Sequence, residues 1–220
     1  MTEPVTIGRA TLYLGDCRDI LPTLGRDAAI VSDPPYGMAA NTDYTRFCAG
    51  SEVSRRKRGA GGKYPPVCGD NEPFDPSELL GFRQVILWGF NHFSSRLPQG
   101  GGLVWLKRNP EAFGTFLSDA ELAWEKGKTG VAAFMSYPQA MAHDRHHPTQ
   151  KPVDLMQWCI AKTRGAVIDP YMGSGTTGLA AHLESRDFIG CEIDPTYFDI
   201  ACKRIEQAQR QSDLFIEAAA

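Results

Sequence analysis

Residues 167–178, with the sequence VIDPYMGSGTTG, pass from an apolar run through a glycine-rich turn into a helical pattern. Glycines allow the backbone to approach a ligand closely, and the first turn of a helix presents unpaired N–H groups to it. Gly173, Gly175 and Gly178 also match the spacing GxGxxG, which is typical of dinucleotide-binding folds. The stretch therefore predicts a strand, turn and helix that bind a nucleotide-like ligand in an open α/β fold.

Two carboxylates beside this turn favour one class of nucleotide. Asp169 ends the apolar run, where a carboxylate would repel a pyrophosphate but could accept a hydrogen bond from an ammonium group. Glu192 closes the next apolar run roughly 20 residues later, where an acidic side chain binds the two hydroxyls of a ribose. An adenosine with an amino-acid tail satisfies both, so S-adenosylmethionine is the predicted cofactor. A nicotinamide dinucleotide is the alternative that uses the same glycines.

Apolar runs elsewhere predict the rest of the sheet. Buried strands are expected at residues 11–15, 28–32, 84–88, 102–106, 131–135, 166–169 and 188–193. Their near-continuous apolarity is typical of strands covered on both faces. Helices are expected over Pro152–Arg164, with Gly165 as its stop, and after Asp194, with Pro195 at the first position. Strands that alternate with helices predict a mostly parallel, doubly wound sheet.

A second motif, Asp33-Pro34-Pro35-Tyr36, directly follows the apolar run 28–32. Two consecutive prolines fix φ near about −65°, so the chain turns rigidly at a strand end. The motif suits methylation of an exocyclic amine on an aromatic ring: the Asp33 carboxylate and the Pro34 carbonyl would bind its two N–H groups and localise its lone pair. Tyr36 would stack on the base after it leaves the duplex, returning roughly 1–3 kcal/mol of the flipping cost. A structural turn with a packed tyrosine is the alternative.

Residues 38–76 interrupt the alternation and show little periodicity, so a loop insertion is expected there. Only Asp43 and Glu52 oppose its cationic side chains over 46–63, which makes this the strongest positive segment of the chain. A solvated surface loop is the plainer interpretation, and contact with phosphates is the functional one.

Composition limits the class of protein. The chain has 220 residues, 42% apolar and 22% charged, with a net charge of −3, which suits one domain with an insertion and excludes disordered and fibrous classes. Charges interrupt the first thirty residues and no apolar run reaches about 18, so neither a signal peptide nor a membrane span is predicted. The six cysteines lack CxxC pairs, and the histidines lack partners at ligand spacing. We therefore expect a cytoplasmic protein with reduced thiols and no metal site.

These motifs together resemble the exocyclic-amino DNA methyltransferases, and their order is similar to that of the β class. In that class the catalytic tetrapeptide precedes the cofactor loop, as residues 33–36 precede 169–177 here. The sequence HPTQKP at 147–152 is similar to the motif that clasps the methionine end of the cofactor, and LGDC at 14–17 resembles the element whose aspartate reaches the adenine. Residues 101–107, 118–124 and 188–204 are similar to small phage and prophage enzymes.

The resemblance implies a single methyltransferase domain over residues 1–220, with a Rossmann-like fold, a permuted motif order, the 38–76 insertion and a C-terminal tail at 206–220. The implied catalytic residues are Asp33, Pro34, Pro35 and Tyr36. The implied cofactor-binding residues are Asp16, Cys17, Asp33, Thr149, Lys151, Asp169, Tyr171, Gly173, Ser174, Gly175, Thr176 and Glu192.

The implied activity is site-specific methylation of double-stranded DNA at N6 of a flipped adenine. Asp at the head of the tetrapeptide favours adenine N6, whereas enzymes acting on cytosine N4 more often carry Ser; N4 methylation is the alternative. Methylation of RNA or of a protein amide, where related tetrapeptides usually begin with Asn, is a further alternative, as is a DNA-binding regulator without catalysis. Cytosine C5 methylation is disfavoured because the chain has no Pro-Cys motif.

The resemblance also implies DNA, and a sliding clamp or a second copy of the chain, as binding partners. The stretch between Ala132 and His147, where the β class carries its target-recognition region, is short, so the 38–76 insertion is expected to contact DNA through Arg46, Arg55, Arg56, Lys57, Arg58 and Lys63. Gln211–Phe215 resembles the peptide by which bacterial proteins bind the replication sliding clamp, with a fraying helix end as the alternative. A homodimer or the clamp would reinforce modest DNA affinity. The setting implied is a bacterial or phage-infected cell, with or without a restriction system.

Overall fold

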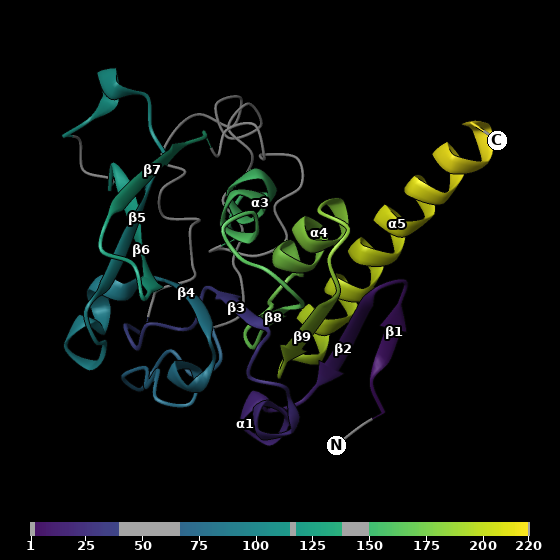
Figure 1. Ribbon diagram of the computed structural model, residues 1–220, viewed down its shortest axis with the longest axis horizontal. Coiled ribbons are helices and arrows are strands. Elements are labelled where there is room, and N and C mark those ends of the chain that lie inside the picture. Colours follow the sequence, from purple (N-terminus) through teal and green to yellow (C-terminus); the bar gives the residue numbers. More distant parts are fainter. Residues whose placement is uncertain (1–2, 40–66, 115–117, 138–149, 220) are drawn as a thin grey trace, which may run out of the picture.

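The computed structural model describes residues 3–39, 67–114, 118–137 and 150–219, with 212–219 described as backbone (Figure 1). A nine-stranded sheet organises the molecule, in the order β1-β2-β9-β8-β3-β4-β6-β5-β7. The strands are β1 (Val5–Ile7), β2 (Ala10–Leu14), β3 (Ala29–Ser32), β4 (Gln84–Trp88), β5 (Gly100–Leu106), β6 (Ala120–Lys126), β7 (Val131–Met135), β8 (Val167–Asp169) and β9 (Phe188–Glu192).

Most strand pairings are parallel, as predicted. β3 pairs in parallel with β4 on one side and with β8 on the other, where Ile30 lies opposite Ile168. The β8–β9 and β9–β2 pairings continue the parallel part. β1 is antiparallel to β2 at one edge, and β6 runs against both β4 and β5. The strands that precede the two sequence motifs, β3 and β8, are therefore direct neighbours.

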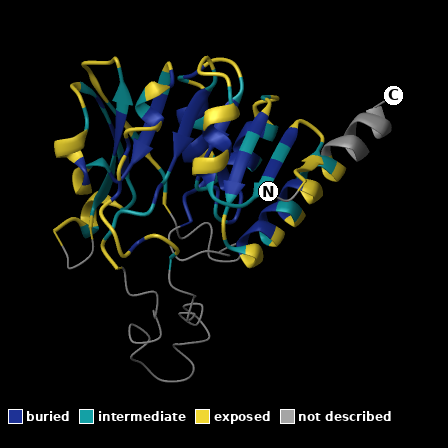
Figure 2. Ribbon diagram, turned by 90° about the horizontal axis from the view of Figure 1, so that it is seen from below, coloured by how far each residue is buried: buried dark blue, intermediate teal, exposed yellow. Residues whose placement is uncertain are grey.

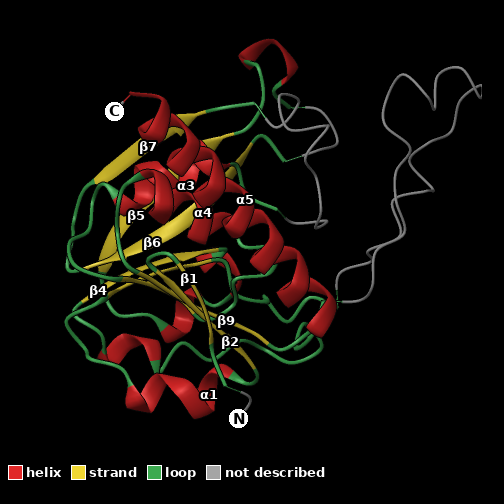
Figure 3. Ribbon diagram, turned by 90° about the vertical axis from the view of Figure 1, so that its right-hand side faces the viewer, coloured by secondary structure: helices red, strands yellow, loops and turns green. Residues whose placement is uncertain are grey.

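Helices cover both faces of the sheet, which confirms the doubly wound arrangement (Figure 3). One layer consists of α3 (Val153–Ile160), α4 (Thr176–Leu183) and α5 (Pro195–Ala219). The other contains α1 (Cys17–Ile20) and the 3₁₀ helices η1 (Leu21–Thr23) and η3 (Leu79–Gly81); further 3₁₀ helices are η4 (Phe90–His92), η5 (Ser94–Arg96) and η6 (Pro110–Ala112).

Alternate residues of the central strands enter two different cores. Val31 packs with residues of α3, α4 and α5, whereas the preceding Ile30 packs with residues of α1, η1 and η3. β3 and β8 are buried along their whole length, in agreement with their continuous apolarity (Figure 2). The sheet is thus the middle layer of three.

All seven predicted strands are present, and their observed ends lie within two residues of the predicted ones. β1 and β6 were not predicted; the β6 sequence AELAWEK mixes charged and apolar residues without alternation. The prediction that 131–135 is a buried strand is wrong in one respect. β7 lies at an edge of the sheet with alternating exposure, and Val131 is 74% exposed.

The helix predicted over Pro152–Arg164 is shorter than expected. It ends at Ile160 because the following N–H groups of Lys162 and Thr163 close turns onto the carbonyls of Cys159 and Ile160. Gly165 adopts a φ of +78° in the loop before β8 and does not stop the helix.

α5 begins at Pro195 as predicted. The Asp194 carboxylate caps it by accepting hydrogen bonds from the N–H groups of Thr196 and Tyr197. The backbone of residues 206–219, interpreted above as a tail, continues this helix (Figure 1).

Among the described residues, no helix combines the length and apolarity needed to cross a membrane. Within the same ranges, no three His, Cys, Asp or Glu side chains are grouped so as to hold a metal ion. The described cysteines, Cys17, Cys68, Cys159, Cys191 and Cys202, are free thiols.

Candidate active site

Four acidic side chains follow or end consecutive parallel strands. Asp16 follows β2, Glu192 ends β9, Asp169 ends β8, and Asp33 follows β3. Because these strands are parallel neighbours, their carboxyl ends meet at one edge of the sheet, where open α/β sheets bind ligands. The tetrapeptide and the glycine turn therefore lie at the same edge of the sheet.

The glycine turn needs its glycines for two reasons. Gly173 and Gly175 have φ values of +52° and +82°, a backbone region that favours glycine. A Cβ at Gly175 would lie 2.9 Å from the Cβ of Ala201, and one at Gly178 would lie 2.6 Å from Cδ1 of Ile205. The first two glycines thus shape the turn, and the third allows α4 to pack closely on α5.

Two other predicted cofactor residues of the turn, Ser174 and Thr176, are buried. The Ser174 hydroxyl donates to Oε1 of Gln150 at 3.3 Å, and Arg204 donates to the Ser174 carbonyl oxygen at 2.6 Å. These contacts connect the turn to α5 and to the loop before α3.

Asp169 is buried beneath the turn. Its Oδ1 accepts hydrogen bonds from the Ser32 hydroxyl at 2.6 Å and the Tyr171 N–H at 3.1 Å, and its Oδ2 accepts one from the Thr177 hydroxyl at 2.5 Å. Burial raises the pKa of Asp169 to about 6. The carboxylate predicted to receive an ammonium group therefore also ties β3, β8 and α4 together.

Glu192 joins the turn to the start of α5. Its Oε2 accepts from the Gly173 N–H at 2.9 Å and its Oε1 from the Asp194 N–H at 2.8 Å, while burial raises its pKa. The Glu192 carbonyl accepts from the Gly15 N–H at 2.9 Å, which brings the 14–17 element beside it.

Asp16 caps α1 and binds the guanidinium of Arg18, whose hydrogen bonds lower the pKa of the Asp16 carboxyl. Tyr171 packs against the apolar cluster that contains Cys17, and its ring lies edge-on to Phe74 with centroids 5.7 Å apart. The aromatic ring of the glycine turn and Cys17 of the 14–17 element therefore share one apolar cluster.

The Asp33-Pro34-Pro35-Tyr36 corner has an internal hydrogen bond. The Tyr36 hydroxyl donates to Oδ1 of Asp33 at 2.5 Å. Burial, followed by the adjacent Asp33 carboxylate, raises the pKa of Tyr36 well above its usual value, so the hydroxyl remains a donor. Pro34 is buried, and the Asp33 side chain is 17% exposed.

Asp70, which the sequence analysis did not identify as a site residue, binds the backbone of the Asp33–Tyr36 corner. Oδ1 of Asp70 accepts hydrogen bonds from the N–H groups of Tyr36, Gly37 and Met38 at 3.0, 2.8 and 3.1 Å. Asp70 lies within the expected 38–76 insertion, where only the basic residues attracted attention. One carboxylate oxygen thus satisfies three successive donors that the turn leaves unpaired.

The Tyr36 ring stacks on His92, with centroids 4.8 Å apart and planes inclined by 13°. A Cβ at Gly89, which has a φ of +73°, would lie 2.0 Å from Cε1 of Tyr36. His92 was also missed, although it follows a predicted parallel strand, β4, at the edge where site residues are expected.

Lys151, expected to bind the cofactor, directly contacts the tetrapeptide. Its Nζ lies 2.5 Å from Oδ2 of Asp33 and 3.0 Å from Oε2 of Glu121. The other oxygen of Glu121 binds Nζ of Lys107 at 2.8 Å. The lysine expected at the methionine end of the cofactor is thus a direct partner of the tetrapeptide. Glu121 and Lys107 also belong to the site, although no sequence motif predicted them.

Several predicted residues lie outside the described ranges. They are Thr149 and the proposed DNA-binding residues Arg46, Arg55, Arg56, Lys57, Arg58 and Lys63. Most side chains of the clamp-like peptide 211–215 lie outside the described set as well. Their roles stay predictions.

Comparison with known proteins shows similarity to DNA methyltransferases. The sequence pattern of a DNA methylase family, N6_N4_Mtase, matches residues 99–203. The DNA adenine methyltransferase YhdJ of Escherichia coli K12 is 25% identical over 96% of this chain and 88% of its own length.

Solved structures share the fold. The complex of M1.HpyAVI with S-adenosylmethionine has a TM-score of 0.55 at 23% identity and covers 89% of this chain and 99% of its own. The cytosine-N4-specific PvuII DNA methyltransferase has a TM-score of 0.55 at 14% identity and covers 94% of this chain and 93% of its own. With its tetrapeptide before its glycine turn, the chain is similar to the DNA methylase family over residues 99–203 and to a DNA adenine methyltransferase over nearly its whole length.

Proposed function

We propose that this protein transfers a methyl group from S-adenosylmethionine to N6 of adenine in double-stranded DNA. One observation carries the proposal: the Asp33–Tyr36 corner and the glycine turn end neighbouring parallel strands, β3 and β8. A bound nucleotide and a base presented to the corner would therefore meet at the same edge of the sheet. A dinucleotide oxidoreductase would leave the corner without a role.

The residues around Gly15 and Glu192 fit the adenosine part of this cofactor. A Cβ on Gly15 would meet no heavy atom within 4 Å, so the surface beside Asp16 is open to a ligand. Each Glu192 oxygen accepts one backbone N–H, which leaves acceptor capacity for ribose hydroxyls. When bound, the cofactor supplies an electrophilic methyl group on a positively charged sulfur.

Asp33 and Pro34 act on the target amine. Each Asp33 oxygen already accepts one hydrogen bond, from Tyr36 or from Lys151, and retains capacity for another. The Asp33 carboxylate accepts one N–H of the amine and the Pro34 carbonyl accepts the other, so the nitrogen lone pair is turned out of conjugation with the ring. The proton that the nitrogen loses moves to Asp33 or to solvent.

Tyr36 supplies a stacking surface for the flipped base. In the free protein its ring stacks on His92, which is exposed. A base therefore binds Tyr36 either by displacing His92 or on the opposite face of the ring. Stacking contributes roughly 1–3 kcal/mol against the cost of flipping.

Adenine is favoured over cytosine by the aspartate at position 33 and by the activity named for YhdJ, a relative that spans nearly the whole chain. The fold does not exclude cytosine, because the N4-specific PvuII enzyme shares it with a TM-score of 0.55. Methylation of cytosine N4 is the second candidate for this reason.

DNA is the proposed partner, and the basic segment within 38–76 is its proposed contact. Phosphate contacts of this kind would make DNA affinity strongly salt-dependent. A homodimer and a sliding-clamp contact through Gln211–Phe215 would each add affinity without further DNA contacts.

The test is to incubate the protein with duplex DNA and the cofactor, digest the DNA, and identify the methylated nucleoside by mass spectrometry. We expect N6-methyladenine. Asp33→Ala should abolish transfer while cofactor affinity, measured by calorimetry, stays within about twofold, because the substituted side chain faces the amine. N4-methylcytosine would establish the second candidate. Activity only on RNA or protein acceptors, or retained activity in Asp33→Ala, would overturn the proposal.

A further inference from the structure

Two lysines and two carboxylates form a chain of ion pairs that ends on Asp33. Lys151 bridges Oδ2 of Asp33 and Oε2 of Glu121, and Lys107 binds Oε1 of Glu121. The Lys151 side chain is 6% exposed and that of Glu121 is 30% exposed. The positive and negative charges in this group are equal in number, which is how proteins tolerate charges away from water.

The reversed direction of β6 brings Glu121 to this place. Glu121 is the second residue of β6 and pairs with Trp105 of β5, while Lys107 directly follows β5. Because β6 is antiparallel to β4 and β5, its beginning lies at the edge where those strands end. Lys151 approaches the same point from the segment before α3. Asp33 thus depends on three separate parts of the chain.

We propose that Glu121 is a positioning residue that shares the Lys151 ammonium with Asp33, so that Asp33 stays ionised yet basic enough to accept the proton of the target amine. In that step the N–H bond breaks, its electron pair stays on nitrogen, and the proton bonds to a carboxylate oxygen of Asp33. The role rests on the proposed function, but the arrangement of charges does not.

The physical argument is a balance between burial and charge. Burial raises the pKa of Asp33, which would leave a neutral carboxyl, and the Lys151 ammonium opposes that rise. If Lys151 paired with Asp33 alone, its positive charge would lower the pKa of Asp33 and make the carboxylate a weak base. Glu121 competes for the same ammonium and thereby restores basicity to Asp33.

Lys151 and Glu121 remain charged. Burial alone would lower the pKa of Lys151, but the Asp33 and Glu121 carboxylates raise it well above its usual value. Burial alone would raise the pKa of Glu121, but Lys151 and Lys107 outweigh it and lower that pKa to about 2. Within the described ranges, the charged or titratable groups that act on Asp33 are Lys151, Glu121 and Tyr36. Besides burial, the Asp33 charge in turn raises the pKa of Asp169 at the end of β8.

The decisive measurement is the titration of the Asp33 carboxyl carbon by NMR in protein labelled at aspartate, with the signal assigned by its loss in Asp33→Asn. Glu121→Gln should lower the pKa of Asp33, because a negative charge is removed. Lys151→Met should raise it. Lys107→Met, at a more exposed lysine, should raise it by less and serves if Lys151→Met does not fold.

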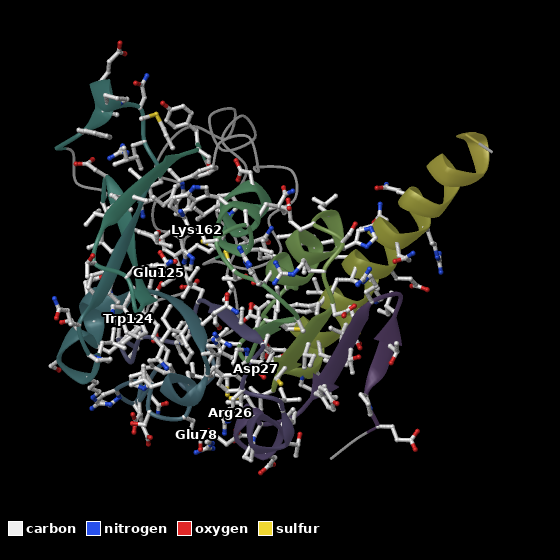
Figure 4. All side chains as sticks on the ribbon, in the orientation of Figure 1. Arg26, Asp27, Glu78, Trp124, Glu125 and Lys162 are labelled. Carbon is white, nitrogen blue, oxygen red and sulfur yellow. The ribbon has the colours of Figure 1, made fainter. Side chains whose placement is uncertain are left out.

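Glu125→Gln is the matched control, since Glu125 lies four residues along the same strand, on the same face, and outside the ion-pair chain. Its side chain is labelled in Figure 4. This substitution should leave the pKa of Asp33 at its wild-type value. A titration that fails to move, or moves in the same direction in Glu121→Gln and in the lysine variants, would overturn the proposal, since a merely structural cluster predicts no such opposition of sign.

Kinetics give the second readout. In Glu121→Gln we expect kcat for DNA methylation to fall by about 10-fold, with the KM for DNA and for cofactor within about twofold. The acid limb of the pH profile should move to lower pH, and Glu121→Asp should recover part of kcat. If the wild type methylates nothing, the proposed function fails, and the NMR titration still decides the role of Glu121.

Discussion

Gly89 controls the position of Tyr36 at the scale of a single residue. It has a φ of +73°, and a Cβ there would collide with the tyrosine ring. Gly89→Ala should reduce methyl transfer by at least about 10-fold, because the ring must leave its place beside Asp33. Steady-state kinetics on DNA measure the loss, and thermal unfolding reports the cost in stability.

A substitution at Gly127 distinguishes displacement of the Tyr36 ring from backbone strain as the cause of that loss. Gly127 has nearly the same φ, +70°, but a Cβ there meets nothing within 4 Å. Gly127→Ala should therefore show only the backbone cost, about 1–3 kcal/mol of unfolding free energy, with wild-type kcat. Equal activity in the two variants would mean that the position of Tyr36 does not depend on Gly89.

Residues with a local signature were predictable from sequence, and residues defined by distant contacts were not. Asp33 precedes two prolines and Asp169 precedes a glycine turn, so the adjacent residues identify each as a candidate site residue. Asp70 binds N–H groups 32 to 34 positions earlier in the chain, and Glu121 pairs with Lys151, 30 positions later. No nearby residue distinguishes them from surface carboxylates.

At the scale of elements, the packing of α4 on α5 depends on Gly178. A Cβ there would lie 2.6 Å from Cδ1 of Ile205 and 2.9 Å from Cε1 of Phe188. Gly178→Ala should destabilise the protein by about 1–3 kcal/mol, because the overlap exceeds the helix propensity that alanine adds. Denaturant unfolding measures the change.

A second substitution tests the cause. Ile205→Val removes the Cδ1 atom, so it should restore part of the stability of Gly178→Ala, although alone it costs about 0.5–1.5 kcal/mol. Additive losses in the double variant would show that the overlap with Ile205 is not the reason for the destabilisation.

Elements also differ in how well their sequences predict them. The β3 sequence AIVS and the β8 sequence VID are buried on both faces, so apolarity alone reveals them. In β6, Glu121 belongs to the ion-pair chain and Glu125 lies on a partly exposed face. These charged residues break the apolar pattern by which a strand would be predicted. The strand that supplies the unexpected site residue is thus the one that the pattern missed.

At the scale of the whole molecule, Asp169 should impose a pH dependence on stability. Burial raises its pKa from 3.8 to about 6, so between these values the folded protein binds more protons than the unfolded chain. The free energy of unfolding should therefore fall as pH rises from about 4 to about 6, with Asp169 contributing on the order of 3 kcal/mol.

Two variants isolate this contribution in denaturant unfolding across pH 4–7. Asp169→Asn should be free of it, so its stability relative to the wild type should improve as pH rises through this window. Ser32→Ala removes a donor to the carboxylate and should extend the decline to higher pH. A constant difference between wild type and Asp169→Asn at all pH values would contradict the prediction.

The neighbouring positions of β3 and β8 also set an order of events during synthesis. The ribosome completes β3 long before β8, yet β3 is buried on both faces and paired on both edges in the folded protein. Until β8 emerges, the nascent chain presents an apolar strand with an open edge, the kind of surface to which chaperones bind and at which aggregation starts. A chain whose translation stops before β8 would therefore be both inactive and prone to aggregate.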